Sequence, residues 1–358
     1  MDFNKKFVNG FLLIFLIIFI TFGSIYLFSS DLSSKDKQTN ELRIFNWEDY
    51  FGETTIQDFE QEYGVKVYLD TFQDEDLAVE VLKQNASKYD LFIVSDDLID
   101  NLIDIDLIQK INIKKIPNLK YVDSFCLERS YNKVNIYAVP YIRGTTGIVL
   151  NSKYFPKDGW NYGLLWDEKN TGKIGLLNNP LELISMASNY LGYGLVPEDS
   201  FEMNNVLRYL YLQKKIALGY FDLLTLEEMM LNETLIAAQV YEETGLRLES
   251  EYDNFEYILP EEGVPLWIDN FVIPSGAKNY LNSMKFIDYV LRPEVSADIS
   301  NYLMAVSCNK EAEKLIEDDF LLDVYNRDVS QYELFSEYTS SVSLEKLKED
   351  VLKNIIEG

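Results

Sequence analysis

The sequence of 358 residues contains no histidine and only two cysteines, Cys126 and Cys308. Without histidine there can be no Ser-His-Asp or Cys-His nucleophile system, and no histidine-ligated zinc, copper or non-haem iron. The two cysteines lie far apart in the sequence and match no metal-binding or redox spacing. We therefore expect no metal, no cofactor and two buried free thiols. A long-range disulfide is the alternative if the protein faces an oxidising compartment.

Basic residues are scarce as well. The chain has 32 lysines and arginines against 59 aspartates and glutamates, which gives a formal net charge of −27. Binding of nucleic acid needs a basic face that displaces counterions from phosphates, so we expect no nucleic-acid partner. An acidic balance permits a cationic ligand, but it also serves simply to keep a protein soluble.

The N-terminal segment indicates where the protein works. Lys5 and Lys6 precede an uncharged apolar run at 11–28, which is longer than a typical signal-peptide core and long enough to be a candidate transmembrane helix. The lysines predict that the N-terminus stays inside the cell. Residues 29–41 are small and polar, which is typical of a flexible tether. We expect residues 11–28 to export the chain, with cleavage, or to anchor it in the membrane. The rest then works in the periplasm or on the outer face of the cytoplasmic membrane.

Strands and helices alternate from Leu42 onward. Apolar alternation predicts strands at 42–47, 65–72 and 89–94, and helical spacing predicts a helix at 75–85. Thr54 with Gln57 resembles a capping box that begins a helix between the first two strands. This rhythm is typical of α/β layers around a parallel sheet, and the length suits two domains.

The second half of the chain continues less evenly. We expect two strands, 136–141 and 147–151, on either side of a crossing segment between the domains. Further strands are predicted at 234–241, 256–260 and 267–274. Pro180 begins a helix that ends near Gly192 or Gly194, and two helices between 280 and 303 are broken at Arg292–Pro293. An amphipathic helix ends the chain.

Aromatic and acidic residues recur where the predicted strands end. Ligands of open α/β sheets bind beyond the carboxyl ends of the strands. Taken singly, such aromatics usually cap a core and such acids usually cap helices. Together they suit a slender alkyl chain with several ammonium groups, because carboxylates pair with ammonium and aromatic faces attract cations and cover methylenes. The pattern therefore favours a polyamine ligand. The residues concerned are Trp47 to Tyr50, Ser95 to Asp97, Glu182, Tyr241 to Glu243, Trp267 and Asp269.

Several segments, in this order and spacing, resemble the spermidine/putrescine-binding proteins of ABC importers. The resemblance runs from about Leu42 to the C-terminus and implies the two-lobed periplasmic-binding-protein fold of type II, an α/β fold with the ligand in the interlobe cleft. It implies that 42–144 and 269–308 form lobe 1, and that 145–268 and 309–358 form lobe 2. The segments are IFNWEDYF, YDLFIVSDD, YAVPYIRGTTGIVLN, MASNYLGY, LPEEGVPLWIDNFVIP and FIDYVLRPEVS.

The resemblance also implies a set of ligand-binding residues. Glu182 corresponds to an acid that meets one ammonium end, and Trp267 and Asp269 to a pair that covers the methylene chain and binds the other amine. Tyr241 stands where the family has a second tryptophan. The remaining residues implied to line the cleft are Trp47, Asp49, Tyr50 and Ser95.

Some positions depart from the family's pattern and bear on specificity. Glu48 replaces a small hydroxyl, Asp97 an expected aromatic and Asn179 a second acid, and we count all three as ligand-binding candidates. Arg143 replaces a tryptophan, and we expect it to point away from the ligand or to pair with an acid such as Asp97. The expected cleft tyrosine near Ala305 is missing, although Tyr302 is close. Spermidine and putrescine both stay open as ligands.

The expected function is therefore a non-enzymatic one. We expect a monomeric solute-binding protein that captures a polyamine and presents it to the permease subunits of an ABC transporter. One alternative is the same fold with another solute, such as an iron chelate, thiamine or an amino acid. A second is a membrane-anchored glycosidase that uses Glu182 and Asp269 as acid and base, and a third is a structural or receptor role.

Overall fold

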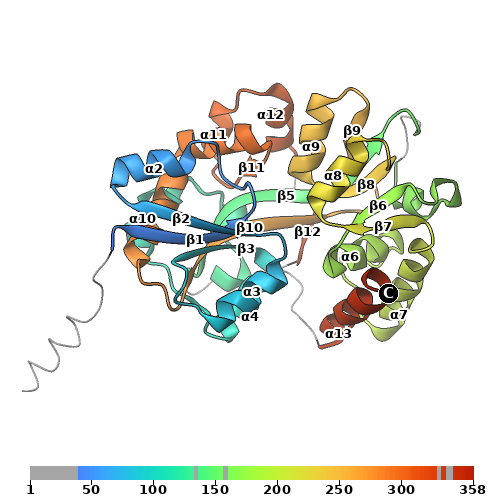
Figure 1. Cartoon of the computed structure of the whole chain (residues 1–358), viewed down its shortest axis with the longest axis horizontal. Coiled ribbons are helices and arrows are strands. Elements are labelled where there is room, and N and C mark those ends of the chain that lie inside the picture. The colour runs from blue at the N-terminus through green and yellow to red at the C-terminus, as the bar shows by residue number, and fades with distance from the viewer. Residues whose placement is uncertain (1–38, 133–135, 156–159, 329–331, 336–341) are drawn as a thin grey trace, which may run out of the picture.

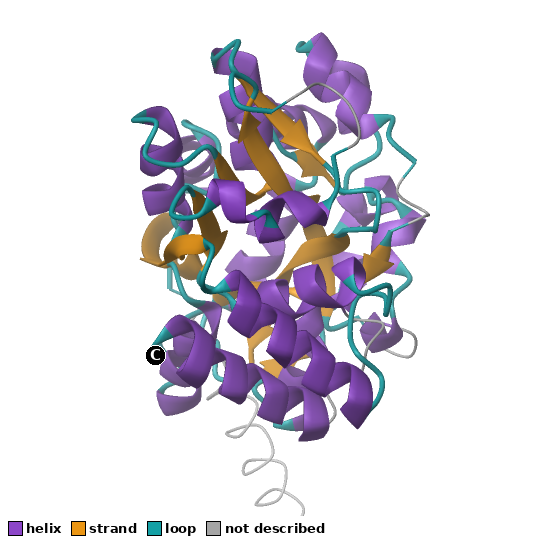
Figure 2. Cartoon of the chain, turned by 90° about the vertical axis from the view of Figure 1, so that its right-hand side faces the viewer, coloured by secondary structure: helices purple, strands orange, loops and turns teal. Residues whose placement is uncertain are grey.

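A mixed β-sheet runs through both halves of the molecule, and helices cover its faces (Figures 1 and 2). The computed structural model describes residues 39–132, 136–155, 160–328, 332–335 and 342–358. Along the main path the strands follow the order β2-β1-β3-β10-β5-β8-β6-β7. The expected α/β architecture is confirmed, with parallel strands within each half and antiparallel strands between them.

The first lobe is built on three parallel strands. Each strand is followed by a helix, so the carboxyl ends of β1 and β3 lie at one edge of the sheet, as βαβ units require. The strands are β1 (Glu41–Trp47), β2 (Lys66–Phe72) and β3 (Leu91–Ser95), and the helices are α2 (Thr55–Tyr63), α3 (Glu75–Gln84), α4 (Ile99–Asp104), α10 (Tyr280–Val290) and α11 (Pro293–Leu303). Thr54 does not cap α2 as predicted, because its hydroxyl is hydrogen-bonded to Asp58.

The second lobe repeats this scheme with its own core. Its parallel strands β6, β7 and β8 are joined by β9, which pairs with the long strand β5. The strands are β6 (Ile174–Leu177), β7 (Ala217–Phe221), β8 (Ala237–Tyr241) and β9 (Phe255–Ile258), and the helices are α6 (Pro180–Tyr190), α7 (Ser200–Gln213), α8 (Leu223–Leu231), α9 (Glu242–Glu251) and α13 (Val342–Val351).

Two long antiparallel strands join the lobes. Strand β5 (Ala138–Asn151) is one continuous strand of 14 residues, so the prediction of two short strands with a separate crossing segment was wrong. Strand β10 (Pro265–Pro274) pairs with β5 and with β3, and the register shifts between Asp269 and Asn270. A strand can continue through the crossing because the two β-branched threonines after Gly144 favour extended backbone.

Shorter elements complete the chain. The helix Ala312–Leu315 packs on α11, whereas α13 packs on α6 and α7. The division of the chain into exact lobe segments stays a prediction. The other short elements are β4 (Ile108–Gln109), α5 (Ser124–Leu127), β11 (Val306–Ser307), α12 (Asp319–Tyr325) and β12 (Glu333–Leu334).

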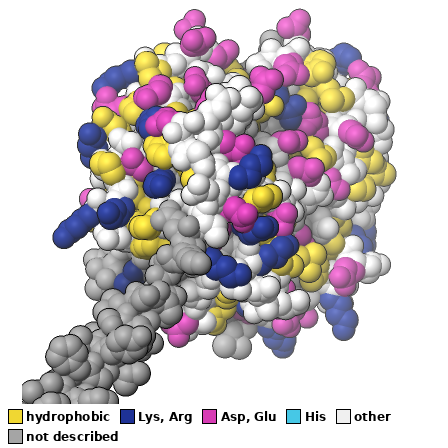
Figure 3. All heavy atoms as spheres, turned by 60° about the vertical axis from the view of Figure 1, so that its left-hand side comes forward, with side chains coloured by type: hydrophobic (Ala, Val, Ile, Leu, Met, Phe, Trp, Pro, Cys, Tyr) yellow, Lys and Arg dark blue, Asp and Glu magenta, His cyan; other side chains and the backbone are white. Residues whose placement is uncertain are grey.

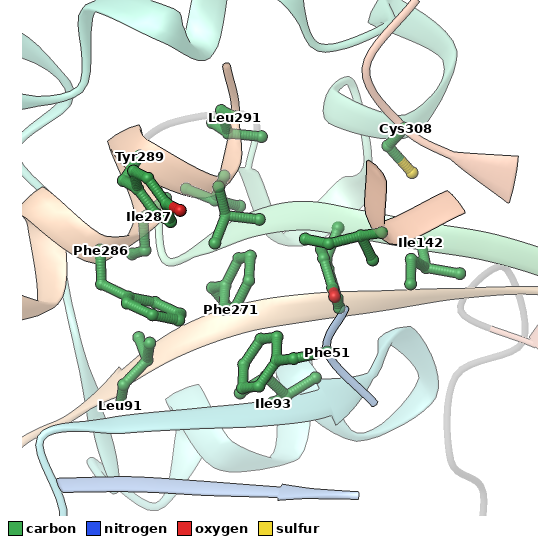
Figure 4. Packing of buried hydrophobic residues seen from close by; sticks show 14 of the residues in the cluster. Phe51, Leu91, Ile93, Ile142, Phe271, Phe286, Ile287, Tyr289, Leu291 and Cys308 are labelled. Atoms are coloured by element: carbon green, nitrogen blue, oxygen red, sulfur yellow. The ribbon is translucent and has the colours of Figure 1, made fainter. Parts of the chain in front are cut away.

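Aromatic side chains fill the core of the first lobe (Figure 4). Phe286 of α10 meets Phe51 edge-on, with ring centroids 5.4 Å apart, and Phe271 of β10 lies beside them. Cys126 and Cys308 belong to the same core, where both are buried free thiols, as expected. Because Phe51 anchors the chain directly after Tyr50, this core fixes one wall of the site described below.

The predicted export or anchor segment at 11–28 lies outside the described residues. Among the residues that the structure describes, none forms a helix that is both long and apolar enough to span a bilayer. On the face shown in Figure 3, acidic side chains are interspersed with basic ones.

Candidate functional site

Asp269 is the centre of a hydrogen-bonded group at the junction of the lobes. Strand pairing places it opposite Ser95, at the end of β3. The Tyr50 hydroxyl donates to its Oδ2 at 2.6 Å, and the Ser95 hydroxyl donates to its Oδ1 at 3.2 Å. The structure thus brings together three residues that the sequence predicts from three separate segments.

Burial controls the ionisation of this group. Asp269 is 5% exposed, and burial raises its pKa to about 6, although the hydrogen bonds from Tyr50 and Ser95 oppose the rise. The pKa of Tyr50 lies well above its usual value, first because of burial and then because of the charges of Asp269 and Glu243. The tyrosine therefore stays a hydrogen-bond donor.

Glu75 belongs to the same group, although the sequence analysis did not select it. The Ser95 N–H donates to its Oε1 at 2.7 Å. Asp74 caps α3 by accepting from the Leu77 N–H, which leaves Glu75 free to turn toward Ser95. Burial, then Asp97 and Asp269, raise the pKa of Glu75 well above its usual value. The only feature of the sequence that could have pointed to Glu75 is its place in the first turn of a helix. Acids are common at that position in helices of any function.

Glu182 occupies the corresponding place in the second lobe. Asn179 caps α6 by accepting from the Leu181 and Glu182 N–H groups, which directs the first turn toward β5. Glu182 is 4% exposed, and the Thr146 hydroxyl donates to its Oε1 at 2.9 Å. Its Oε2 is buried without a hydrogen-bond partner among the described residues. Burial raises the pKa of Glu182 to about 8.

Two aromatic rings lie near these carboxylates, since the charges of Glu182 and Glu75 act on Tyr241, and Tyr241 contacts Trp267. The ring of Tyr241 meets that of Trp267 edge-on, with centroids 6.1 Å apart, and the Asn179 side-chain amide lies 3.5 Å from the Tyr241 hydroxyl. The indole of Trp267 lies directly over Gly144, where a Cβ atom would come within 2.5 Å of Cζ2. Glycine at this position is therefore required for the tryptophan to lie flat. Trp47 is half-buried and packs against Phe72.

Asp97 lies at the edge of the group, facing the C-terminal helix. It shares a cavity with Lys348 and Glu345 of α13 and Leu181 of α6. Burial raises its pKa to about 6, and the positive charge of Lys348 is the strongest influence in the other direction. The cation that acts on Asp97 is therefore Lys348, not Arg143.

Two glutamates begin α9, and they turn in different directions. Glu242 is buried, accepts a hydrogen bond from Thr145 at 2.9 Å and forms a salt bridge with Arg327. Glu243 has a buried Oε2 with no hydrogen-bond partner among the described residues. Burial raises the pKa of Glu243 to about 8, and Asp269 contributes to the rise. Glu243, one of the strand-end acids noted in the sequence, therefore lies near Asp269, although the family resemblance did not add it to the ligand-binding residues.

Other predicted residues lie elsewhere. Glu48 and Asp49 are exposed, and Glu48 accepts a hydrogen bond from Gln73 at 2.5 Å. Asp49 has φ +51°, which turns the chain away from the strand direction directly after Trp47. The structure does not bring either carboxylate to the buried group, so their part in ligand binding stays a prediction.

Arg143 and Tyr302 also lie away from the buried group. Burial raises the pKa of Tyr325 and of Cys308, and the positive charge of Arg143 opposes both rises, so Arg143 lies near β11 and α12. This position agrees with the expectation that it points away from the ligand. Tyr302 is 55% exposed, whereas Ala305 is buried in the core.

The described residues contain no cluster of three or more histidine, cysteine or acidic side chains arranged to hold a metal ion. Glu182, Glu243 and Asp269 also form no salt bridge with a lysine or arginine in the described part of the chain; the nearby Arg247, for example, is bound by Glu227 at 2.6 Å. Carboxylates that share a buried space repel each other and favour the neutral form unless a cation joins them. The arrangement is therefore suited to holding an organic cation with an apolar body.

Comparisons with known proteins agree with this architecture. The family model described as bacterial extracellular solute-binding protein matches residues 54–324. The putrescine/agmatine-binding protein of Pseudomonas aeruginosa is 28% identical over 300 residues, which cover 77% of this chain and 80% of that protein. The putrescine-binding periplasmic protein PotF of Escherichia coli is 25% identical over 334 residues, which cover 87% of each chain.

A solved structure extends the likeness to three dimensions. The putative spermidine/putrescine ABC transporter protein of Listeria monocytogenes is 26% identical and superposes with a TM-score of 0.82, covering 88% of this chain and 99% of that chain. The fold is accordingly the two-lobed fold of type II periplasmic binding proteins. The chain belongs to the bacterial extracellular solute-binding proteins.

Proposed function

We propose that this protein captures a polyamine, spermidine or putrescine, between its two lobes and delivers it to the permease of an ABC transporter. One observation carries the proposal. Glu182 is buried beside an aromatic wall with one carboxylate oxygen that has no hydrogen-bond partner among the described residues. A buried carboxylate in that condition is costly unless a cation reaches it.

The opposite end of the site supports the same ligand. Asp269 accepts hydrogen bonds from Tyr50 and Ser95, which orient its carboxylate without neutralising it. Between the two ends, Trp267 and Tyr241 offer apolar and π surface to a methylene chain. An alkyl diamine or triamine matches charge at the ends and apolar surface between them.

Binding and release require the lobes to move. Strands β5 and β10 run through both lobes, so a small bend in this pair opens the cleft between Asp269 and Glu182. Closure excludes water from the site, which strengthens the attraction between ammonium and carboxylate. The names of the relatives, which include periplasmic polyamine-binding proteins, support a role outside the cytoplasm. We propose that residues 11–28 provide export or anchoring, and that the protein acts as a monomer without enzymatic activity.

Thermal unfolding and calorimetric titration with matched ligands test the proposal. Spermidine and putrescine should stabilise the protein, by about 2.7 kcal/mol at 100 times the dissociation constant. In 1,4-butanediol, hydroxyl groups replace the two ammonium groups of putrescine, and it should give no shift. Stabilisation by thiamine, an iron chelate or an amino acid, with none by either polyamine, would contradict the proposal.

Two variants show whether binding occurs at the described site. Glu182→Gln keeps the shape of the side chain and removes its charge, and we expect it to lower polyamine affinity about 100-fold. Glu198→Gln, an exposed position in the same lobe, is the control and should leave the affinity unchanged. Equal affinities for the two variants would place the ligand elsewhere.

A further inference from the structure

Glu243 is an acid of the site that forms no salt bridge with a lysine or arginine in the described part of the chain, although the charge of Arg247 acts on it. It follows Glu242 in the first turn of α9, immediately after the strand end that carries Tyr241. Glu242 is already bound by Arg327 and Thr145, and neither of these residues also binds Glu243. The charge of Glu243 also acts on Asp269, Tyr50 and Tyr241, which come from three different segments of the chain.

The surroundings of Glu243 point to a ligand rather than to an internal contact. Its Oε2 is buried without a hydrogen-bond partner among the described residues, as is Oε2 of Glu182. Glu182 is 4% exposed. The indole N–H of Trp267 is likewise buried and has no hydrogen-bond partner among the described residues. Arg247, four residues further along α9, is bound by both oxygens of Glu227. The charges of both glutamates act on Tyr241, so the two carboxylates lie near the same ring, and each has an oxygen that a group from outside the chain can bind.

The number of carboxylates without a counter-charge distinguishes a diamine ligand from a triamine ligand. Of the acids around the site, Glu75 accepts from the Ser95 N–H, and Asp97 lines a cavity together with Lys348. Neither of them has a buried oxygen without a partner in the described part of the chain, unlike Glu182 and Glu243. Asp269, Glu243 and Glu182 remain, and none of them has a salt bridge within the described residues. A diamine carries two positive charges and would leave one of these carboxylates buried without a counter-charge, which is costly. A linear triamine carries three.

We propose that Glu243 is a ligand-binding residue and that Asp269, Glu243 and Glu182 together receive the three ammonium groups of one linear triamine. The inference rests on the proposed function and sharpens it, because it makes the site selective for spermidine over putrescine. Glu243 is then the residue that determines specificity, since the two other carboxylates suffice for a diamine.

Titration of the full-length protein with spermidine and putrescine tests this selectivity. The wild-type protein should bind spermidine at least tenfold more tightly than putrescine, and Glu243→Gln should reduce spermidine affinity at least tenfold while changing putrescine affinity less than threefold. The control is Glu251→Gln, at an exposed position of the same helix, which should change neither affinity.

The outcomes distinguish the two proposals. If the wild-type protein binds neither polyamine, the proposed function itself fails. If it binds both with equal affinity, or putrescine more tightly, the triamine assignment is wrong while polyamine binding stands. Equal losses of both affinities in Glu243→Gln, or no loss, would remove Glu243 as the specificity residue. The wild-type ratio keeps the test decisive even if the variant is poorly folded.

Discussion

Buried carboxylates occur in two regions of this molecule, and the chain provides for them differently. At the base of the first lobe, Asp90 is 2% exposed and accepts four hydrogen bonds. Its Oδ1 is bound by the N–H groups of Lys278 and Asn279, and its Oδ2 by the N–H of Arg43 and the side-chain amide of Asn279. In the cleft, Glu182 accepts one hydrogen bond from Thr146, and its second oxygen has no partner among the described residues.

The difference separates structural carboxylates from binding ones. Four donors around Asp90 replace the water that the carboxylate loses on burial, and they tie β1, β3 and the segment before α10 together. The cleft carboxylates have fewer donors than acceptor sites, so their solvation is incomplete until a cation enters. The number of hydrogen bonds to a buried acid therefore indicates its role: a fully hydrogen-bonded acid is structural, and an acid with an unpartnered oxygen is a candidate for ligand binding.

The largest effect is expected at Asp90. Asp90→Ala removes the acceptor from four donors at once, and we expect the free energy of unfolding to fall by about 4 kcal/mol, because each buried donor left without a partner costs about 1 kcal/mol or more. Urea denaturation measures this. The polyamine affinity of the folded fraction should be unchanged. A loss of affinity in this variant without denaturant would contradict the distinction between structural carboxylates and ligand-binding ones.

Asp269 should behave in the opposite way. Asp269→Asn keeps an acceptor for Tyr50 and Ser95 but removes the charge, and we expect about 100-fold weaker polyamine binding, equivalent to about 2.7 kcal/mol, with little loss of stability. Asp97→Asn should weaken binding less than fivefold, because Lys348 faces that carboxylate. Calorimetric titration compares the two variants, and equal or reversed losses would refute the assignment.

The cleft should also respond to pH in the ligand-free protein. Burial raises the pKa of Glu182 to about 8 and that of Asp269 to about 6, so the closed form binds more protons than a solvated cleft. The closed form therefore loses stability relative to an open one as pH rises from 5 to 9, by about 5 kcal/mol. Small-angle X-ray scattering should give a larger radius of gyration at pH 9, and added spermidine should reverse the change. A radius that is independent of pH would count against buried, unpaired carboxylates.

The smallest effect is expected at the exposed acids. Glu48→Gln and Asp49→Asn change carboxylates that water already solvates, and we expect each to alter polyamine affinity less than threefold, about 0.5 kcal/mol. The same titration measures these variants at low and moderate salt. A loss comparable with that of Asp269→Asn would show that the loop after β1 folds into the cleft on binding.

Local patterns predict the α/β fold and three residues that the structure brings together, Tyr50, Ser95 and Asp269. Trp267 and Asp269 are two residues apart on a strand, so period-two alternation puts them on one side, and Tyr50 and Ser95 follow strands whose ends share an edge. The continuous strand β5 was missed because Gly144 interrupts its strand pattern. Gly144 is needed there because it packs under Trp267, a contact that the local sequence does not reveal.

The remaining site residues depend on contacts between distant segments. Glu242 and Glu243 are adjacent acids after the same strand, and Arg327, far along the chain, decides which of them is neutralised. Glu75 enters the site because Asp74 takes the cap of α3. Glu48 and Asp49 match the expected motif, yet the turn at Asp49 leaves both exposed. Sequence patterns thus find acids near a cleft but do not reveal their direction.

A crystal structure of the protein with spermidine tests the central claim most directly. If the ligand completes the solvation of the cleft carboxylates, its nitrogen atoms should lie about 2.8 Å from oxygens of Glu182, Glu243 and Asp269, with methylenes against Trp267 and Tyr241. Nitrogen atoms bound elsewhere, with Glu182 and Glu243 still lacking a cation, would contradict the account.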